Sequence, residues 1–431
     1  MTAALLAFVA LFLLLSLGVP IGFGLIIVGT LGFAIITDVG PAFSMLAQNT
    51  VDTVLSYHFS VLPMFLLMGN VIARTRLAEE LYNAAQAFLG HTRGGLAHAT
   101  VISCGAFGAV CGSSMATTAT MCRIAVPAMR ARGYAPALTV GSVAAGGTLG
   151  ILIPPSVAMV LYGLITENDI GALFVAGIVP GILGVLLYMV AIRATVQISR
   201  ESAPEGDPRK PLAERLRALR GVWAILLLFG IVMGGIYGGV FTPTEAASIG
   251  AAGALVIAGL RGDLSFATLY NVVFETARTT AMLFVVLIGA IVFTNFLNVG
   301  GLARSMSGFI LGLDSDPYTV LFAILAIYIL LGCFLDAMAM MLLTVPIFYP
   351  VIVGLGFDPI WFGIVVVVVI EIGLITPPFG MNAFVVRSMV PDVPITTVYR
   401  GVLPFLAADF VRLGLIVAFP AISLFLVETM G

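Results

Sequence analysis

The sequence predicts an all-α, polytopic membrane protein built as two inverted repeats, with about 10–12 transmembrane helices, two re-entrant hairpins and two broken helices. The first observation is composition. Of the 431 residues, 61% are hydrophobic and 9% are charged, whereas soluble domains carry roughly a quarter charged residues. The second observation is a series of long apolar segments, and the third is a proline-interrupted segment that recurs in both halves of the chain.

The apolar segments are compared with the about 20 residues that a transmembrane helix needs. The N-terminal segment has no basic region before it, so we expect a first span rather than a cleaved signal peptide. Two regions, roughly 94–130 and 318–357, are longer than one span and are expected to enter the membrane and turn back. The other expected spans cover roughly 2–17, 20–37, 57–73, 138–163, 172–195, 222–240, 246–260, 278–297, 360–388 and 403–427.

One strongly polar connection, residues 198–221, sets the orientation of the chain. It holds six of the 19 Lys and Arg residues, and the positive-inside rule places it in the cytoplasm. Counting spans outward from it puts Arg93 and Arg130 on the cytoplasmic side. The same count puts Asp316 and Asp358 on the opposite side. Since these charges flank the two long regions, the two hairpins are expected to enter the membrane from opposite faces.

The spacing of prolines repeats in the two halves. Pro136 precedes Pro154 by 18 residues, and Pro359 precedes Pro377 by the same interval. Further prolines match upstream and downstream, which favours duplication over chance. Inverted repeats are typical of secondary transporters, whose substrates and ions bind where paired helices are broken. An offset of 223 residues pairs Gly150 with Gly373, Ile153 with Thr376, and Ser113 with Asp336.

The duplication predicts the organisation of the chain. We expect a first repeat over 1–197, a cytoplasmic linker over 198–221 and a second repeat over 222–431. The broken helices are expected at about 138–163 and about 360–388, each following its hairpin.

The two interruptions, Gly150–Pro154 and Gly373–Pro377, have a chemical use. A proline leaves a carbonyl acceptor of its turn free, and such carbonyls suit hard cations such as Na⁺. The half-helix N-termini made by the same break favour an anion. One break can therefore serve both a cation and an anionic substrate.

Polar residues in the hairpins are the candidates for substrate binding. Ser113, Ser114, Thr117 and Thr118 form a small-residue run that fits either tight helix packing or a binding tip. Its symmetric placement opposite Asp336 favours a binding tip. An ionisable group inside a membrane is a functional candidate by default, which singles out Asp336.

Other polar residues in apolar segments have open alternatives. Glu371 precedes the second break and is either functional or faces an aqueous cavity. Arg123 either pairs structurally, the favoured interpretation, or attracts a substrate carboxylate. Three asparagines are weaker candidates and are expected mainly as interhelical hydrogen-bond partners: Asn295, Asn298 and Asn382.

Enzyme and metal chemistry find little support. The three histidines are scattered, and there is no H-E-x-x-H, P-loop or G-x-S-x-G motif. The four cysteines lack metal-ligand spacing and fit small buried hydrophobic residues. No basic patch suggests nucleic acid. We therefore expect no enzyme, no cofactor and no metal other than sodium.

Long motifs in both halves resemble one known family. They are FGAVCGSSMATTATMCRIAVPAMRARGY, GGTLGILIPPS and GALFVAGIVPG in the first half, and LDAMAMMLLTVPIFYPV, GFDPIWFG and GLITPPFGMNAFV in the second. They are similar to the large membrane subunit of TRAP (tripartite ATP-independent periplasmic) transporters, and the resemblance covers essentially the whole chain. Cys111 stands where a serine is common in the family.

The resemblance implies a sodium-coupled importer of organic acids, such as C4-dicarboxylates or sialic acid, that works as an elevator. The transport domain would comprise about 94–165 plus 318–388, and the remainder would form the scaffold. The first sodium site would use carbonyls of Gly108, Cys111, Gly150, Ile153 and Pro154. The second would use Gly332, Gly373, Thr376 and Phe379. Substrate binding and coupling would involve Ser113, Ser114, Thr117 and Asp336.

The resemblance also implies partners. These are a small four-helix membrane subunit, expected as a separate chain, and a soluble periplasmic binding protein that delivers the substrate. The expected location is the bacterial cytoplasmic (inner) membrane. A stand-alone ion-coupled carboxylate symporter is the alternative within the transporter class, and an intramembrane enzyme is the alternative outside it.

Overall fold

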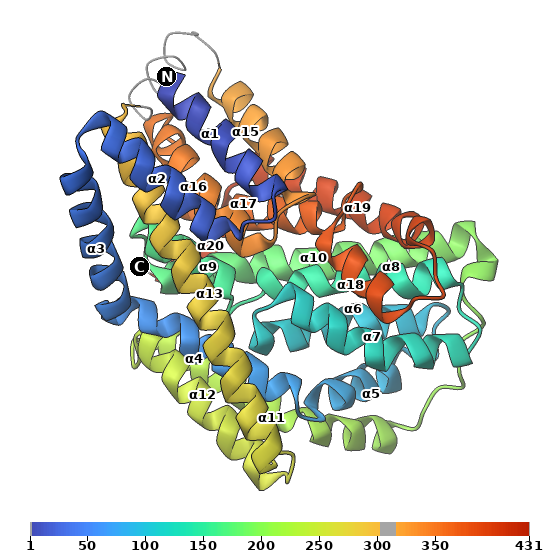
Figure 1. Cartoon of the computed structure of the whole chain (residues 1–431). Coiled ribbons are helices and arrows are strands. Elements are labelled where there is room, and N and C mark those ends of the chain that lie inside the picture. The colour runs from blue at the N-terminus through green and yellow to red at the C-terminus, as the bar shows by residue number, and fades with distance from the viewer. Residues whose placement is uncertain (1, 302–315, 431) are drawn as a thin grey trace.

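A computed structural model describes residues 2–301 and 316–430, and every regular element in these ranges is a helix (Figure 1). Six described helices are long and apolar enough to cross a membrane, or seven if one bent pair counts as a single span. Seven more apolar helices are shorter. The predicted all-α membrane fold is confirmed, and several of the segments counted among the 10–12 expected spans are these shorter helices.

The N-terminal part contains a helix that the hydropathy pattern missed. It forms between two predicted spans, and its axis bends by 55° into the following helix. Polar residues such as Gln48, Asn49 and Asp52 interrupt its apolar face, which explains why it was not counted as a span. The elements are α1 (Thr2–Ser16), α2 (Ile21–Ile36), α3 (Val39–Leu55), η1 (Tyr57–Ser60), α4 (Val61–Ala73) and α5 (Leu77–Leu89).

The first predicted hairpin and broken helix are present. A two-residue turn joins two helices, and the next helix stops after a short 3-10 turn and restarts after five intervening residues. The elements are α6 (Gly95–Cys111), α7 (Ser114–Ala131), α8 (Pro136–Thr148), η2 (Leu149–Ile151) and α9 (Val157–Thr166).

The second hairpin and broken helix follow the same order. The elements are α15 (Pro317–Gly332), α16 (Ala337–Gly354), α17 (Pro359–Ile375) and α18 (Met381–Met389). Both interruptions fall at the Pro-Pro pairs, where the missing N–H groups and ring clashes prevent a continuous helix.

Six further helices complete the described chain. The predicted single span 403–427 is wrong, because the helix ends at Ala418 and a new one begins at Ala421. Pro420 disfavours helical backbone at Phe419, which has φ −129° and ψ 79°. The elements are α10 (Ile170–Ile198), α11 (Leu212–Tyr237), α12 (Pro243–Leu260), α13 (Phe266–Val299), α19 (Ile395–Ala418) and α20 (Ala421–Met430).

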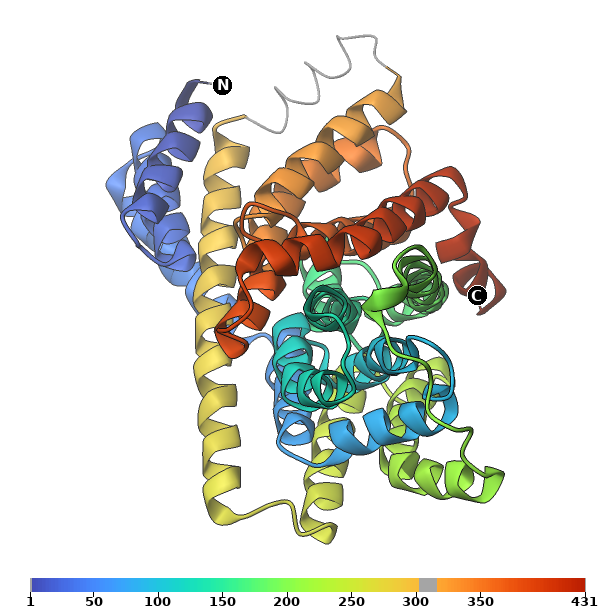
Figure 2. The same cartoon turned by 90° about the vertical axis from the view of Figure 1, so that its right-hand side faces the viewer.

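The helices form an outer and a central group. The outer helices are α1–α4 and α11–α13, with α13 packed on α2 and α4, and α12 packed on α4. Figure 2 shows α13 running the height of the molecule, with α1–α3 on one side and the central helices on the other. The central helices are α6–α10 and α15–α19, in which α10 and α19 pack on each other and α19 packs along α8.

The two halves exchange their last half-helices. The short helix α18 of the second half packs on α7 and α8, and α9 of the first half packs on α16. On α9, the Tyr162 hydroxyl donates to the Pro359 carbonyl over 2.7 Å, and just after α9 the Asn168 amide donates to the Tyr349 hydroxyl over 3.0 Å. Each hairpin is therefore completed by a helix from the other half.

Candidate functional site

The tip of the first hairpin is a tight turn at Gly112 and Ser113. Gly112 has φ +64°, a left-handed conformation that glycine adopts without steric cost. Ser113 is extended and its hydroxyl accepts a hydrogen bond from the Ala116 amide over 3.4 Å. A serine at this position satisfies one of the free amides at the start of a helix. The turn thus directs the N-terminus of α7 toward the break that follows α8.

Two glycines bring this tip against the first break. A Cβ atom built on Gly108 would lie 2.4 Å from the Cα of Gly150. A Cβ built on Gly150 would lie 2.9 Å from the Thr117 hydroxyl oxygen and 3.3 Å from the Ser113 carbonyl oxygen. Backbone atoms from α6, η2 and the hairpin tip therefore meet at one point, and any larger residue would separate them.

The second hairpin contacts the second break in the same way. A Cβ built on Gly332 would lie 2.9 Å from the Cα of Gly373, and one on Gly373 would lie 2.6 Å from the Cα of Gly332. Asp336 begins α16 as Ser113 begins α7, and its Oδ1 accepts from the amides of Met338 (3.0 Å) and Ala339 (3.2 Å). The predicted pairing of Ser113 with Asp336 thus joins two equivalent N-cap residues.

Oxygen atoms dominate the chemistry at the first contact. The Thr117 hydroxyl is buried and has no hydrogen-bond partner among the described residues. It adjoins Gly150 and the Ser113 carbonyl, as the distances above show. A buried hydroxyl and backbone carbonyls without a charged group are the donors that hard cations accept, so this set fits the predicted sodium ion.

One predicted ligand of the first site, the Cys111 carbonyl, points elsewhere in this conformation. The Cys111 carbonyl oxygen lies against α4, where a Cβ on Gly69 would be 2.5 Å from it. The Ile153 side chain packs against Gly105 and Gly181, while Pro154 lies in the break itself.

At the second break, two predicted ligands already have hydrogen-bond partners. The Thr376 hydroxyl donates to the Ile372 carbonyl over 2.6 Å, and the Phe379 carbonyl accepts from the Tyr399 hydroxyl over 2.9 Å. The Phe379 ring stacks on Phe384 and also contacts Phe334. The second contact is therefore less rich in free oxygens than the first.

Comparison with known proteins decides the family. The model of the family described as "Tripartite ATP-independent periplasmic transporter, DctM component" matches residues 8–422. The chain belongs to this TRAP transporter family. It is a TRAP large subunit and a multi-pass membrane protein, as the resemblance implied.

Curated relatives of this TRAP large subunit differ in their named substrates. A C4-dicarboxylate TRAP transporter large permease protein, DctM of Pseudomonas aeruginosa, is 39% identical over 90% of both chains. The sialic acid large permease SiaM of Vibrio cholerae is 32% identical over 96% of both chains. The ectoine/5-hydroxyectoine large permease UehC of Ruegeria pomeroyi is 33% identical over 97% of both. All three are described as transporter permeases, which agrees with a transporter rather than an enzyme.

Solved transporters share the fold. The YdaH transporter of Alcanivorax borkumensis superposes with a TM-score of 0.64 over 88% of both chains, at 18% identity. MtrF of Neisseria gonorrhoeae superposes with a TM-score of 0.54 over 89% of this chain and 83% of its own, at 14% identity.

One hydrogen-bonded bridge ties the two halves of the TRAP large subunit together at the first hairpin. The buried Ser114 hydroxyl donates to Oδ1 of Asn382 on α18 over 2.8 Å. The Asn382 amide in turn donates to the Ala144 carbonyl on α8 over 3.2 Å. Asn382 is therefore the interhelical hydrogen-bond partner that the sequence suggested. The Ser114 hydroxyl proton is used in the hydrogen bond to Asn382. Asn295 and Asn298 make no side-chain hydrogen bond to a described residue.

A buried ionic network lies directly behind both breaks, and sequence reasoning found only one of its members. Arg412 on α19 contacts the carboxylates of Glu371 (2.5 Å) and Asp409 (2.8 Å). The Tyr188 hydroxyl of α10 donates to Asp409 over 2.7 Å and lies 3.3 Å from the Thr148 hydroxyl, in the last residue of α8. Glu371 is fully buried, so it does not face an aqueous cavity.

A signal for this network exists in the sequence. Asp409 and Arg412 are one helical turn apart inside an apolar segment, and charges in such segments are rare and paired. By contrast Arg123 is exposed, and no ion pair with it is found within residues 2–301 and 316–430, so the structural pairing favoured from sequence is not observed there.

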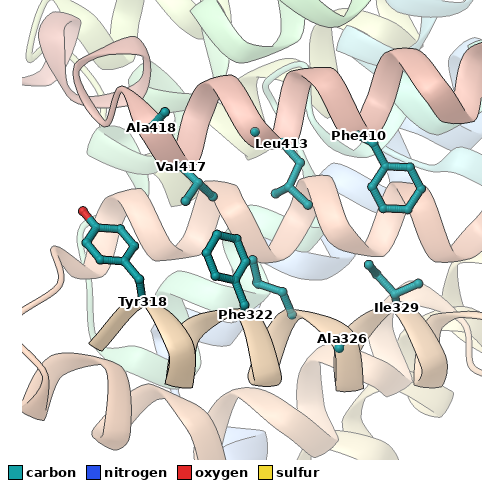
Figure 3. Close-up of a pocket in the computed structure, with 10 residues that line it drawn as sticks. Tyr318, Phe322, Ala326, Ile329, Phe410, Leu413, Val417 and Ala418 are labelled. Carbon is teal, nitrogen blue, oxygen red and sulfur yellow. The ribbon is translucent and has the colours of Figure 1, made fainter. Parts of the chain in front are cut away.

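An apolar crevice of about 490 Å³ lies between α15 and α19 (Figure 3). Tyr318, Phe322 and Ile329 line one wall, and Phe410 and Leu413 line the other. None of the predicted site residues lines it, and its walls offer no charged group for an acid.

Proposed function

We propose that this TRAP large subunit is the transmembrane pathway of a Na⁺-coupled importer of an organic acid. The observation that carries the proposal is the repeated contact between hairpin tip and helix break. Gly108 meets Gly150 in the first half, and Gly332 meets Gly373 in the second. Two such contacts, each next to free helix ends, are what a midplane site for ions and substrate requires.

The first contact is the stronger of the two proposed sodium sites. Carbonyls of Gly108, Gly150, Ile153 and Pro154 would supply its oxygens, and the unpartnered Thr117 hydroxyl adds another. The Cys111 carbonyl would join them only after it turns away from Gly69 on α4. The second site would use Gly332, Gly373, Thr376 and Phe379. It would become available when the Tyr399 hydroxyl releases the Phe379 carbonyl.

The substrate proposal rests on helix ends. Ser113 and Asp336 begin α7 and α16, where backbone amides and the helix dipole favour a carboxylate. The Asp336 carboxylate already accepts two of these amides, so we assign it to coupling and Ser113 to substrate contact. In this conformation the Ser114 hydroxyl is bonded to Asn382, and the Thr117 hydroxyl is assigned to the first sodium site. C4-dicarboxylates and sialic acid, named for two relatives, are the substrate classes proposed.

An elevator mechanism requires a rigid moving body. We place residues 94–165 and 318–388 in it, and the buried network adds α10 and α19. Breaking a buried ion pair lowers the stability of a protein by about 3–5 kcal/mol. Arg412 and Glu371 are therefore expected to move together. The outer helices α1–α4 and α11–α13 would form the scaffold against which this body moves.

The proposed assembly includes two partners. A small four-helix membrane subunit would bind the scaffold, and a periplasmic binding protein would deliver the substrate. The relatives are named as large permeases, a description that fits a multi-subunit system. The proposed location is the bacterial inner membrane.

The test is uptake by the large subunit reconstituted with its small subunit in proteoliposomes. Uptake of labelled substrate is expected only with external Na⁺ and the substrate-loaded binding protein. Equimolar K⁺ serves as the ionic control, and substrate added without the binding protein separates the stand-alone symporter. Full uptake in K⁺ would contradict sodium coupling, while full uptake without the binding protein would contradict the TRAP-type delivery.

A further inference from the structure

A basic cavity of about 810 Å³ lies where the turn between α5 and α6 meets the C-terminal end of α10. Its lining includes Arg93, Arg193 and Arg200, and no acidic residue belongs to it. It lies apart from the hairpin tips and breaks, since none of the proposed sodium or substrate residues lines it. Three guanidinium groups around one cavity require a source of negative charge.

Two of the three arginines have no partner within the described part of the chain. Arg93 donates to the carbonyls of Arg200 (2.6 Å) and Ala203 (3.2 Å) and so holds the start of the linker. The side chains of Arg193 and Arg200 make no hydrogen bond or ion pair with described residues. Their guanidiniums are therefore free to bind an anion from outside.

The buried histidine that lines the cavity already has hydrogen-bond partners. His98 is buried, and its ring nitrogens lie 2.9 Å from the Gly94 carbonyl and 3.2 Å from the Met189 carbonyl. A neutral imidazole carries one N–H, and that N–H is committed to one of these backbone acceptors. Anion recognition falls to the arginines at the mouth.

An apolar stripe leads from this cavity along α10. Ile182, Leu186 and Val190 are spaced four residues apart and are 55%, 52% and 62% exposed. Residues at this spacing share one helix face, and the same face continues to Arg193 and Gln197. The surface therefore presents an apolar track that ends in unpaired positive charge.

We propose that this cavity binds the phosphate headgroup of an anionic phospholipid, with an acyl chain along the stripe of α10. Guanidinium groups match phosphate oxygens in bidentate geometry, and basic pockets at helix ends on the cytoplasmic side suit lipid headgroups. The predicted orientation places the end of α10 at that membrane face. A free phosphate ion would use the arginines but not the apolar stripe.

The experiment titrates phosphatidylglycerol into the detergent-purified full-length protein and counts bound lipids by native mass spectrometry. Each arginine near an anionic lipid contributes about a fivefold change in affinity, so Arg193→Gln with Arg200→Gln should weaken binding roughly 25-fold. The matched control is Arg217→Gln, an exposed arginine at the start of α11, which should leave binding unchanged. Phosphatidylcholine measures binding without net headgroup charge.

Three results would overturn the proposal. They are equal phosphatidylglycerol affinity in the double variant and the wild type, equal affinity for phosphatidylcholine, and displacement of the lipid by millimolar inorganic phosphate. The last result would assign the cavity to a soluble anion. Since neither arginine side chain contacts a described residue through a hydrogen bond, both variants are expected to fold, and a wild-type elution profile from size-exclusion chromatography checks this.

Discussion

At the scale of single residues, the network around Arg412 joins three helices, α10, α17 and α19. Its partners Glu371 and Asp409 lie on α17 and α19, and Tyr188 on α10 completes the shell of Asp409. Space for the guanidinium comes from Gly184, since a Cβ there would lie 2.4 Å from Arg412 Nη1. Two carboxylates around one buried cation are stable only while that cation is present.

Replacing Arg412 with methionine should therefore destabilise the protein strongly. The change leaves two buried carboxylates without their counter-charge, so we expect the free energy of unfolding to fall by about 3–5 kcal/mol. Thermal unfolding of the detergent-purified variant measures the effect. The matched control is Arg74→Met, which breaks the exposed pair with Glu275 and should cost at most about 1 kcal/mol.

A combined variant distinguishes charge from packing. Arg412→Met with Glu371→Leu and Asp409→Leu removes all three charges at once, and such replacements are often neutral. Recovery of most of the lost stability would support the ionic explanation. A triple variant as unstable as Arg412→Met alone would show that shape, rather than charge, holds α19 in place.

The sequence reveals charged residues but not their partners. Glu371 is conspicuous because it interrupts a run of valines and isoleucines. Its contact with Arg412 joins residues 41 positions apart on different helices. No spacing rule along the chain predicts that contact, since it depends on how α17 and α19 pack.

At the scale of elements, the glycine contacts set how closely a hairpin approaches its broken helix. Gly108 and Gly332 each lie near the end of the first helix in their hairpin. The offending atoms at both positions belong to backbone rather than to a movable side chain. Neither contact can adapt to a methyl group by a rotamer change.

Gly108→Ala should thus separate the first hairpin from its break and reduce the uptake rate at least tenfold. Misplacing positioning groups by about 1 Å can lower a rate by a factor of 10². Gly332→Ala should do the same at the second contact. The control is Gly414→Ala on α19, where a Cβ meets nothing within 4 Å. Initial rates in the proteoliposome assay, at matched protein incorporation, decide; wild-type rates in both glycine variants would remove these contacts from the proposed mechanism.

Elements were predictable where the local chemistry is strong. Pro154 and Pro377 mark both breaks, since proline cannot continue a helix. The amphipathic α3 was missed because polar residues shorten its apolar run. The interruption at Pro420 was missed because apolar residues flank it on both sides, and hydropathy does not register backbone geometry.

At the scale of the whole molecule, the hairpin tip of the central group touches the outer group at α4. The Cys111 carbonyl and Gly69 form this contact, so the two groups approach closely at a residue that lacks a side chain. In the proposed elevator this contact must break, because α4 belongs to the scaffold and α6 to the moving body.

Gly69→Ala should disfavour the conformation described here. The added Cβ would lie 2.5 Å from the Cys111 oxygen, so the moving body should leave α4 more often. Cys111 is 5% exposed, and its labelling by a membrane-permeant maleimide, read by peptide mass spectrometry, should become faster. Gly230→Ala on α11, with open space around it, is the control; equal labelling of all three proteins would argue against movement at this contact.

The exchange of half-helices has a consequence for biogenesis. The hydrogen-bond partner of Ser114, Asn382, is synthesised 268 residues later in the chain. At a synthesis rate of about 5–20 residues per second, the ribosome delivers that partner roughly 13–54 s after the first hairpin is made. During that interval the nascent hairpin has polar hydroxyls inside the bilayer and no α18 to cover them. Its early survival therefore depends on the insertion machinery or on neighbouring early helices, rather than on the interactions that hold it in the finished protein.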